Sequence, residues 1–145
     1  MLQAAQLLRH AGILATITTI HVAGGSTTFF DEAQACYQRW DPTTIPGQRL
    51  LAADDIASDS DEIGKSGQFE AADFHRYERD IRYETVDYVD TLLTYSGHRA
   101  LPPSALQGLL TCIASLIDDR YEGHVTKRYL HELRTARRRQ PDAGS

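Results

Sequence analysis

The sequence has only two cysteines, Cys36 and Cys112, and they lie in unrelated segments of the chain. This number argues against a disulfide framework, and the spacing forms no Cys-x-x-Cys pair for redox chemistry or metal binding. The histidines also lack the His-x-x-x-His spacing that is typical of zinc sites. The sequence therefore predicts no metal centre.

A basic leader, long apolar runs and an excess of positive charge are missing as well. The start of the chain has no positively charged n-region, and no segment is as long as a membrane span. We therefore expect a cytoplasmic protein without a membrane partner. The net charge of -5 argues against nucleic acid as a partner, since that binding depends on neutralising phosphates. The one basic cluster, in residues 134–139, borders a segment that we interpret as a flexible, solvated tail, residues 138–145.

What is present fits one α/β domain with a sizeable core, since the 145 residues are 41% hydrophobic. The β-branched run in residues 13–22 predicts a strand covered on both faces, as in a parallel sheet. Thr85 is the expected N-cap of a short helix that follows it. In chain order we expect helix 2–8, strand 13–22, helix 31–40, a loop over 41–68, strand 69–83, helices 86–94 and 102–122, and strand 125–136.

Aromatic and polar side chains around helix 86–94 form the best candidate for the wall of a small-molecule site. Tyr88, Thr91 and Tyr95 share a helix face by their spacing, whereas Val89, Leu92 and Leu93 face elsewhere. The candidate substrate-binding residues are Trp40, Tyr83, Tyr88, Tyr95 and Ser96. A tyrosine cluster packed against loops is the alternative, and Trp40 fits a core position equally well.

Two histidines are candidates for a general base. His21 lies at the carboxyl end of the first strand, where open α/β sheets bind their ligands. His98 follows the tyrosine-rich helix, and imidazole is the side chain that most often moves protons in catalysis. A structural, partly exposed histidine is the alternative for His21.

Three segments, taken in order, resemble the C-terminal half of a class I S-adenosylmethionine-dependent methyltransferase of the small-molecule type. Residues 7–14 are similar to the family's Leu-(Arg/Lys)-Pro-Gly-Gly turn before the fifth strand, with His10 and Ala11 replacing the proline and the first glycine. Residues 88–96 resemble the segment between the sixth strand and the last helix, and residues 123–130 resemble the closing strand. The resemblance implies one domain over residues 1–137.

The resemblance implies a partial Rossmann-like sheet with flanking helices, whose last strand is antiparallel and lies between the fifth and sixth. It also implies S-adenosylmethionine as cofactor and a small-molecule methyl acceptor as substrate. The family holds the cofactor with a Gly-rich turn and an acidic residue in its first half, and this sequence contains no such set. Cofactor-binding residues are therefore unassigned, and we expect a truncated or split methyltransferase whose N-terminal half is missing.

Two other interpretations stay open. A non-catalytic remnant would serve as an interaction module, because the β-branched edge of strand 13–22 would pair with another chain, as in a homodimer. A self-contained α+β domain would instead close its strands without a missing neighbour. The sequence names neither the acceptor nor the atom, oxygen, nitrogen or carbon, that would be methylated.

Overall fold

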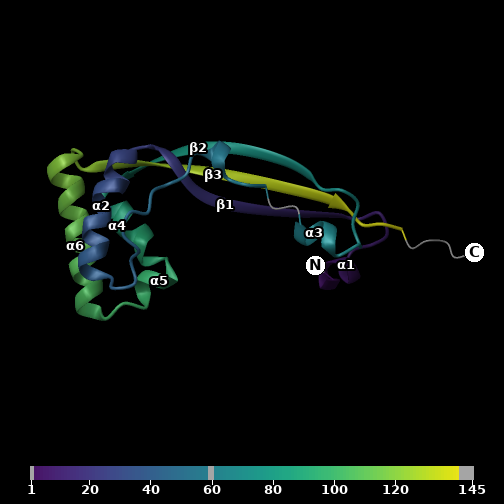
Figure 1. Cartoon of the computed structure of the whole chain (residues 1–145), viewed down its shortest axis with the longest axis horizontal. Coiled ribbons are helices and arrows are strands. Elements are labelled where there is room, and N and C mark those ends of the chain that lie inside the picture. The colour runs from purple at the N-terminus through teal and green to yellow at the C-terminus, as the bar shows by residue number, and fades with distance from the viewer. Residues whose placement is uncertain (1, 59–60, 141–145) are drawn as a thin grey trace, which may run out of the picture. The chain divides into compact units, whose positions relative to one another are not determined.

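The computed structural model describes residues 2–58 and 61–140. Its elements follow the predicted order of helices and strands, with short additional helices in the expected loops (Figure 1). In chain order they are α1 (Leu2–Leu7), β1 (Ile13–Gly25), α2 (Thr27–Trp40), the 3-10 helix η1 (Ala53–Asp55), α3 (Asp61–Lys65), β2 (Asp73–Glu84), α4 (Thr85–Leu93), α5 (Ser96–Arg99), α6 (Pro103–Arg120) and β3 (His124–Arg137).

The three strands form one antiparallel sheet in the order β1-β3-β2, so the last strand of the chain lies in the middle. The α/β class is therefore confirmed, and the last strand is antiparallel to its neighbours. The partial Rossmann-like methyltransferase sheet stays a prediction. Among the described residues no parallel pair of neighbouring strands is found, so the expected parallel environment of β1 is wrong.

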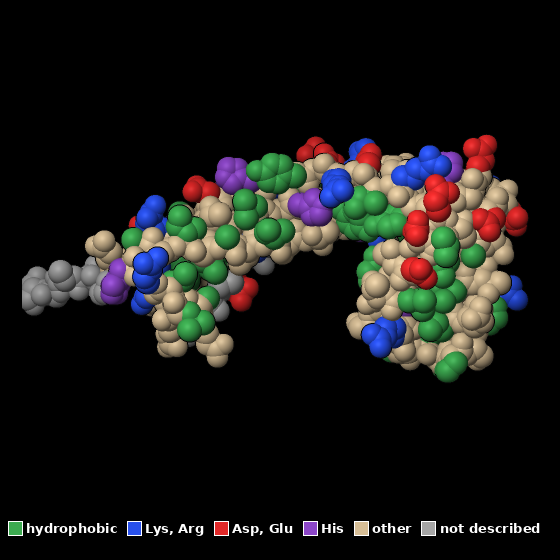
Figure 2. All heavy atoms as spheres, turned by 180° about the vertical axis from the view of Figure 1, so that it is seen from behind, with side chains coloured by type: hydrophobic (Ala, Val, Ile, Leu, Met, Phe, Trp, Pro, Cys, Tyr) green, Lys and Arg blue, Asp and Glu red, His purple; other side chains and the backbone are tan. Residues whose placement is uncertain are grey.

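The expectation that both faces of β1 are covered is also wrong. Ile13 and Ile17 are 56% and 72% exposed. Figure 2 shows hydrophobic side chains at the surface along the strands, beside charged and histidine side chains. β-branched residues stabilise any pleated surface, so the run predicted the strand correctly but not its burial.

The chain divides into two compact units. The terminal unit comprises Met1–Ile20, Ala53–Arg79 and Leu130–Ser145, and the helical unit comprises His21–Ala52 and Asp80–Tyr129. The larger core belongs to the helical unit, where α2, α4 and α6 pack together. Its buried side chains are Phe29, Phe30, Ala33, Cys36, Tyr88, Leu92, Leu109, Leu110, Ile113, Ile117 and Val125.

A disulfide and a close glycine–tryptophan contact are among the contacts that join α2 to α6 within the helical unit. Cys36 and Cys112 form a disulfide with a Cα–Cα distance of 5.8 Å, although 76 residues separate them in the sequence. One turn earlier on α6, Gly108 lies against the ring of Trp40, and a Cβ atom there would come within 2.5 Å of that ring. The sequence analysis did not predict this disulfide, because two cysteines so far apart in the sequence are brought together only when the two helices pack.

The start of α4 differs from the predicted cap. Glu84 occupies the N-cap position, and the helix begins at Thr85. The Thr85 hydroxyl instead donates a hydrogen bond to the carboxylate of Asp118, and so links α4 to the end of α6.

The terminal unit has a smaller core, formed by Ala5, Ile63, Phe69 and Ala136. In the same unit, the buried carboxylate of Glu132 accepts hydrogen bonds from Arg76 Nε at 2.7 Å and Arg134 Nε at 2.8 Å. Arg76 also donates to the carbonyl oxygens of Ala53 and Ile56, which attaches the segment around η1 to the strands.

The segment interpreted as a flexible tail lies partly outside the described residues. Its first two residues are hydrogen-bonded within the terminal unit. The backbone N–H of Arg138 donates to the carbonyl of Gly12, and that of Arg139 donates to the carbonyl of Gln68.

Candidate functional site

The helical unit contains an open cavity of about 470 Å³. Side chains of β1, α2, the segment after α2, α4 and β3 line it. The aromatic and ionisable residues of this lining are His21, Phe30, Asp31, Tyr37, Arg49, Tyr88, Tyr95 and Lys127. The volume lies within the range that is typical of small-molecule sites.

The turn between β1 and α2 positions one side of the cavity. Gly24 and Gly25 have φ values of 141° and 58°, which side chains disfavour, and a Cβ atom on Gly25 would lie 2.4 Å from the carbonyl oxygen of Thr126. The backbone N–H of Gly24 donates to the Thr27 hydroxyl at 2.9 Å, so α2 begins directly after the strand. Phe30 of α2 thereby meets His21 of β1 edge-on, with ring centroids 4.4 Å apart.

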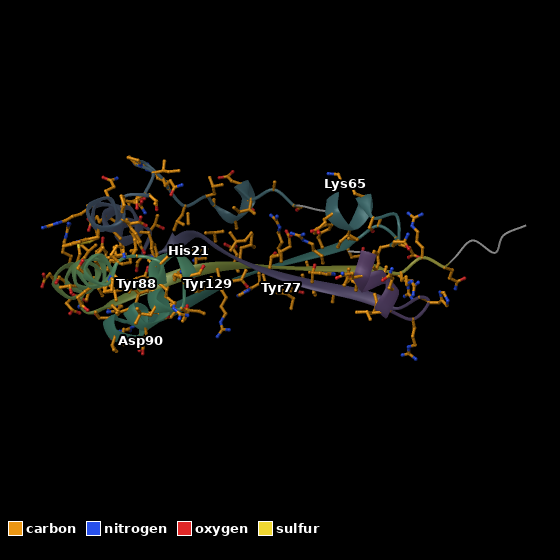
Figure 3. All side chains as sticks on the ribbon, turned by 90° about the horizontal axis from the view of Figure 1, so that it is seen from below. His21, Lys65, Tyr77, Tyr88, Asp90 and Tyr129 are labelled. Carbon is orange, nitrogen blue, oxygen red and sulfur yellow. A yellow bond between two sulfur atoms is a disulfide. The ribbon has the colours of Figure 1, made fainter. Side chains whose placement is uncertain are left out.

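Aromatic rings form much of the lining and its support. Figure 3 shows His21, Tyr88 and Tyr129 close together in the helical unit, and the ring centroids of His21 and Tyr129 are 6.1 Å apart. Burial raises the pKa of the Tyr37 phenol to about 12 and that of Tyr88 above its usual range. Both phenols are therefore neutral near pH 7, and they add hydrogen-bonding groups to the wall.

His21 has a buried nitrogen, Nε2, that lacks a hydrogen-bond partner among the described residues. Burial lowers the pKa of this imidazole to about 4, and the positive charge of Lys127 acts in the same direction. His21 is therefore neutral near pH 7. A buried polar atom without a partner is costly, so a ligand group that bonds Nε2 would be favoured.

Lys127 is the second unusual group in the cavity, because its side chain is a buried cation with 4% exposure. Its ammonium donates a hydrogen bond to the Tyr95 hydroxyl at 2.8 Å. It also lies 5.2 Å and 5.1 Å from the ring centroids of Tyr95 and Tyr129, which is within the range of cation–π attraction. Within the described part of the chain, no carboxylate forms an ion pair with it.

A comparison with protein-family models finds no match, and a comparison with curated proteins finds none either. Among residues 2–58 and 61–140, no group of three or more His, Cys, Asp or Glu side chains is arranged to hold a metal ion. None of the helices in those residues combines the length and apolar character that a membrane span needs.

The cavity brings together some of the site residues that the sequence suggested. His21, Tyr88 and Tyr95 line it directly. Tyr83 and His98 contact lining residues instead, since the ring centroids of Tyr83 and Tyr88 are 6.0 Å apart and His98 Nε2 lies 3.1 Å from Tyr37 Oη. The roles of these residues stay predictions.

Two of the suggested residues lie elsewhere in the helical unit. Trp40 packs at the edge of the core against Gly108, in line with its alternative interpretation as a packing residue. Ser96 is exposed at the start of α5 and is not part of the cavity lining.

The predicted face of α4 was wrong in one respect. Leu92 lines the cavity with Tyr88 and Tyr95, whereas it was expected to face away from them. Thr91, expected on the tyrosine face, donates its hydroxyl to the carbonyl of Asp87 one turn earlier. The helix ends at Leu93, so Tyr95 no longer follows helical spacing from Thr91.

Sequence reasoning missed Lys127, although the strand pattern contained a signal. Lys127 alternates with Val125 and Tyr129, so the three share one side of β3. A lysine between two such residues on a half-buried strand is unusual, since lysines are almost never fully buried.

Proposed function

We propose that this chain supplies the acceptor-binding part of an S-adenosylmethionine-dependent methyltransferase that acts on a small molecule. The observation that carries the proposal is the aromatic cavity of about 470 Å³, with the buried polar groups of His21 and Lys127 in its wall. The strand order β1-β3-β2 with an antiparallel last strand supports it, because the methyltransferase resemblance implies this arrangement for the closing strands.

The lining suits a reaction in which alignment matters most. Methyl transfer is an in-line displacement, so a rigid aromatic wall that orients the acceptor contributes to the rate. In this proposal, Tyr88 and Tyr95 hold the acceptor, and Tyr83 supports the wall through its ring contact with Tyr88. His21 Nε2 accepts a hydrogen bond from the acceptor, and His98 acts indirectly by positioning Tyr37.

The methyl donor would be held by residues outside this sequence. S-adenosylmethionine needs a glycine-rich turn that approaches it closely and a carboxylate for its ribose. When bound, it supplies an electrophilic methyl group on a sulfonium. β1 is an edge strand of the sheet, and this edge is where we propose that a donor-binding half joins the chain.

The proposal is tested by methyl transfer in a joined protein. The chain is expressed together with the segment encoded immediately upstream of Met1, and labelled S-adenosylmethionine is supplied with a panel of small acceptors. We expect labelled product. The rate should fall at least about tenfold in the His21→Ala variant, and it should fall by less in His98→Ala. Ser96→Ala is the matched control, since Ser96 lies outside the cavity lining. Equal rates in all variants would contradict the assigned roles, and a joined protein that binds the donor but methylates nothing would contradict the function.

A non-catalytic interaction module is the second candidate. The observation that favours it is edge strand β1, with Ile13 and Ile17 exposed. Such an edge readily pairs with another strand. Light scattering should then detect a dimer that the Ile17→Lys variant no longer forms, and a monomer at high protein concentration would contradict this candidate.

A further inference from the structure

We propose that the cavity binds a phenol in its ionised form, with the phenolate oxygen at Lys127 Nζ and the aromatic ring between the cavity's aromatic side chains. This inference deepens the proposed function, and rests on it, by naming the class of methyl acceptor. Binding of the phenol itself is a property of this chain and is measurable without methyl transfer.

The first argument is the charge of Lys127. An ammonium that leaves water loses several kcal/mol of hydration, and an anion in hydrogen-bond contact is the usual compensation. The partners that the helical unit provides are the Tyr95 hydroxyl and two aromatic rings, which offset only part of this cost. An anionic oxygen in the cavity would offset the remaining cost of burying the Lys127 ammonium.

The other charged groups of the lining also fit an anion. Arg49 adds a second cation and Asp31 of α2 is the carboxylate of the lining, and both side chains are exposed. Tyr37 and Tyr88 stay protonated because burial raises their pKa values, and His21 stays neutral near pH 7 because burial lowers its pKa to about 4. The charged side chains that face the cavity therefore leave a net positive charge.

The second argument is the shape and chemistry of the remaining wall. Phe30, Tyr37 and Tyr88 present ring faces and edges, and aromatic ligands gain from such contacts beyond the apolar area that they bury. His21 Nε2 has no hydrogen-bond partner among the described residues, so it offers a site for a second polar group of the ligand, as donor or acceptor according to the tautomer. A flat ring with an acidic hydroxyl matches these features together, whereas an aliphatic alcohol would leave Lys127 without an anion.

Binding changes the protonation of the ligand only. The phenol releases its proton to solvent when it binds as phenolate. S-adenosylmethionine held by residues outside this sequence would supply an electrophilic methyl group, and the residues of this chain would bind and orient the phenolate oxygen.

The test uses the full chain and 4-nitrophenol, which absorbs visible light only when it is ionised. The absorbance of the probe is followed against pH with and without saturating protein. We expect the bound probe to ionise about one pH unit lower than the free probe, a tenfold preference for the phenolate. We also expect 4-nitroanisole, its methyl ether, to bind at least about tenfold more weakly at pH 8.

Substitutions assign the effect to one residue. Lys127→Met should abolish the shift in probe ionisation while the protein keeps its fold, because replacing a buried charge by an apolar residue of similar size is often tolerated. Lys65→Met is the matched control, since Lys65 and Lys127 are the two lysines of the chain and Lys65 lies in α3 of the terminal unit. It should leave the shift unchanged.

The inference would be overturned by no shift with the unmodified chain, by an equal shift in Lys127→Met, or by equal binding of phenol and methyl ether. Benzoate tests for a carboxylate ligand, and binding that is tighter than that of 4-nitrophenol would also overturn it. The outcome is separable from that of the proposed function. A phenolate shift without methyl transfer in the joined protein would contradict only the function, and transfer to another acceptor without the shift would contradict only the phenol.

Discussion

Lys127 and Glu132 are both buried charged side chains of β3, but their surroundings assign them different roles. Glu132 accepts hydrogen bonds from two arginines, one of which also holds two backbone carbonyls. Lys127 contacts a hydroxyl and aromatic rings beside a cavity. A charge with a complete set of protein partners stabilises the fold, whereas a charge whose partners are incomplete is available to a ligand.

Replacing Glu132 by glutamine should therefore destabilise the protein. Arg76 is 28% exposed, so the loss lies between that of an exposed and a fully buried ion pair, at about 2 kcal/mol. Urea unfolding followed by circular dichroism measures it. Arg82→Gln is the control, because Arg82 and Glu84 form an exposed pair, and it should cost less than about 0.5 kcal/mol.

The Glu132 effect should depend on pH in a defined direction. Burial raises the pKa of its carboxyl, but the hydrogen bonds from Arg76 and Arg134 outweigh burial, so the pKa lies below its ordinary value of 4.5. The stabilisation is therefore complete above that value and is lost as the pH falls through the lowered pKa. The difference in the free energy of unfolding between the unmodified chain and Glu132→Gln should shrink from pH 7 to pH 3. A difference that stays constant would contradict this role of Glu132.

His21 should titrate far below a typical histidine. Its pKa of about 4 results from burial, with a further contribution from Lys127. Since the folded pKa lies below the unfolded value, this residue reduces stability as the pH falls from about 6.5 to 4. An NMR titration of the imidazole should give a midpoint near 4 in the full chain, and a midpoint near 6.5 would show that the ring is solvated.

At the scale of elements, the packing of α2 on α6 determines the stability of the helical unit. The disulfide between Cys36 and Cys112 closes a long loop, so reduction should lower the free energy of unfolding by about 2–4 kcal/mol. Urea midpoints with and without reductant measure this loss. The double variant Cys36→Ser and Cys112→Ser should show no response to reductant, and two free thiols in the untreated unfolded protein would contradict the bond.

Gly108 allows the same two helices to approach each other. Alanine normally favours a helix interior over glycine by about 1 kcal/mol, but here its Cβ would collide with the Trp40 ring. Gly108→Ala should therefore destabilise the protein by about 1–2 kcal/mol and alter the emission of the single tryptophan. Gly97→Ala is the control, since a Cβ there meets nothing within 4 Å, and equal effects of both would contradict the packing argument.

The elements themselves were largely predictable from sequence, and their burial was not. Helix 102–122 was predictable because helix periodicity is a local property. Its apolar residues at helical spacing are Leu106, Leu109, Leu110, Ile113, Leu116 and Ile117, and all but Leu106 and Leu116 are buried. The exposure of Ile17, the disulfide and the position of Lys127 depend on residues far away in the sequence. Tyr88 and Tyr95 were found from their aromatic character, whereas Trp40 has the same character and lies against Gly108.

At the scale of the whole molecule, the protein has a cavity proposed for the acceptor and a sheet in which β1 is an edge strand. The cavity lies within the helical unit, so it does not depend on how the two units are arranged. The β1 edge connects the two candidate functions, because either a donor-binding half or a second copy of the chain would add a strand there.

Calorimetric titration with S-adenosylmethionine tests the central claim most directly. The claim is that these residues hold the methyl acceptor, and that the methyl donor is held by residues outside them. The account predicts no measurable binding to this chain alone and micromolar binding once the chain is joined to a glycine-rich donor-binding segment. Micromolar binding to the chain alone would contradict the account.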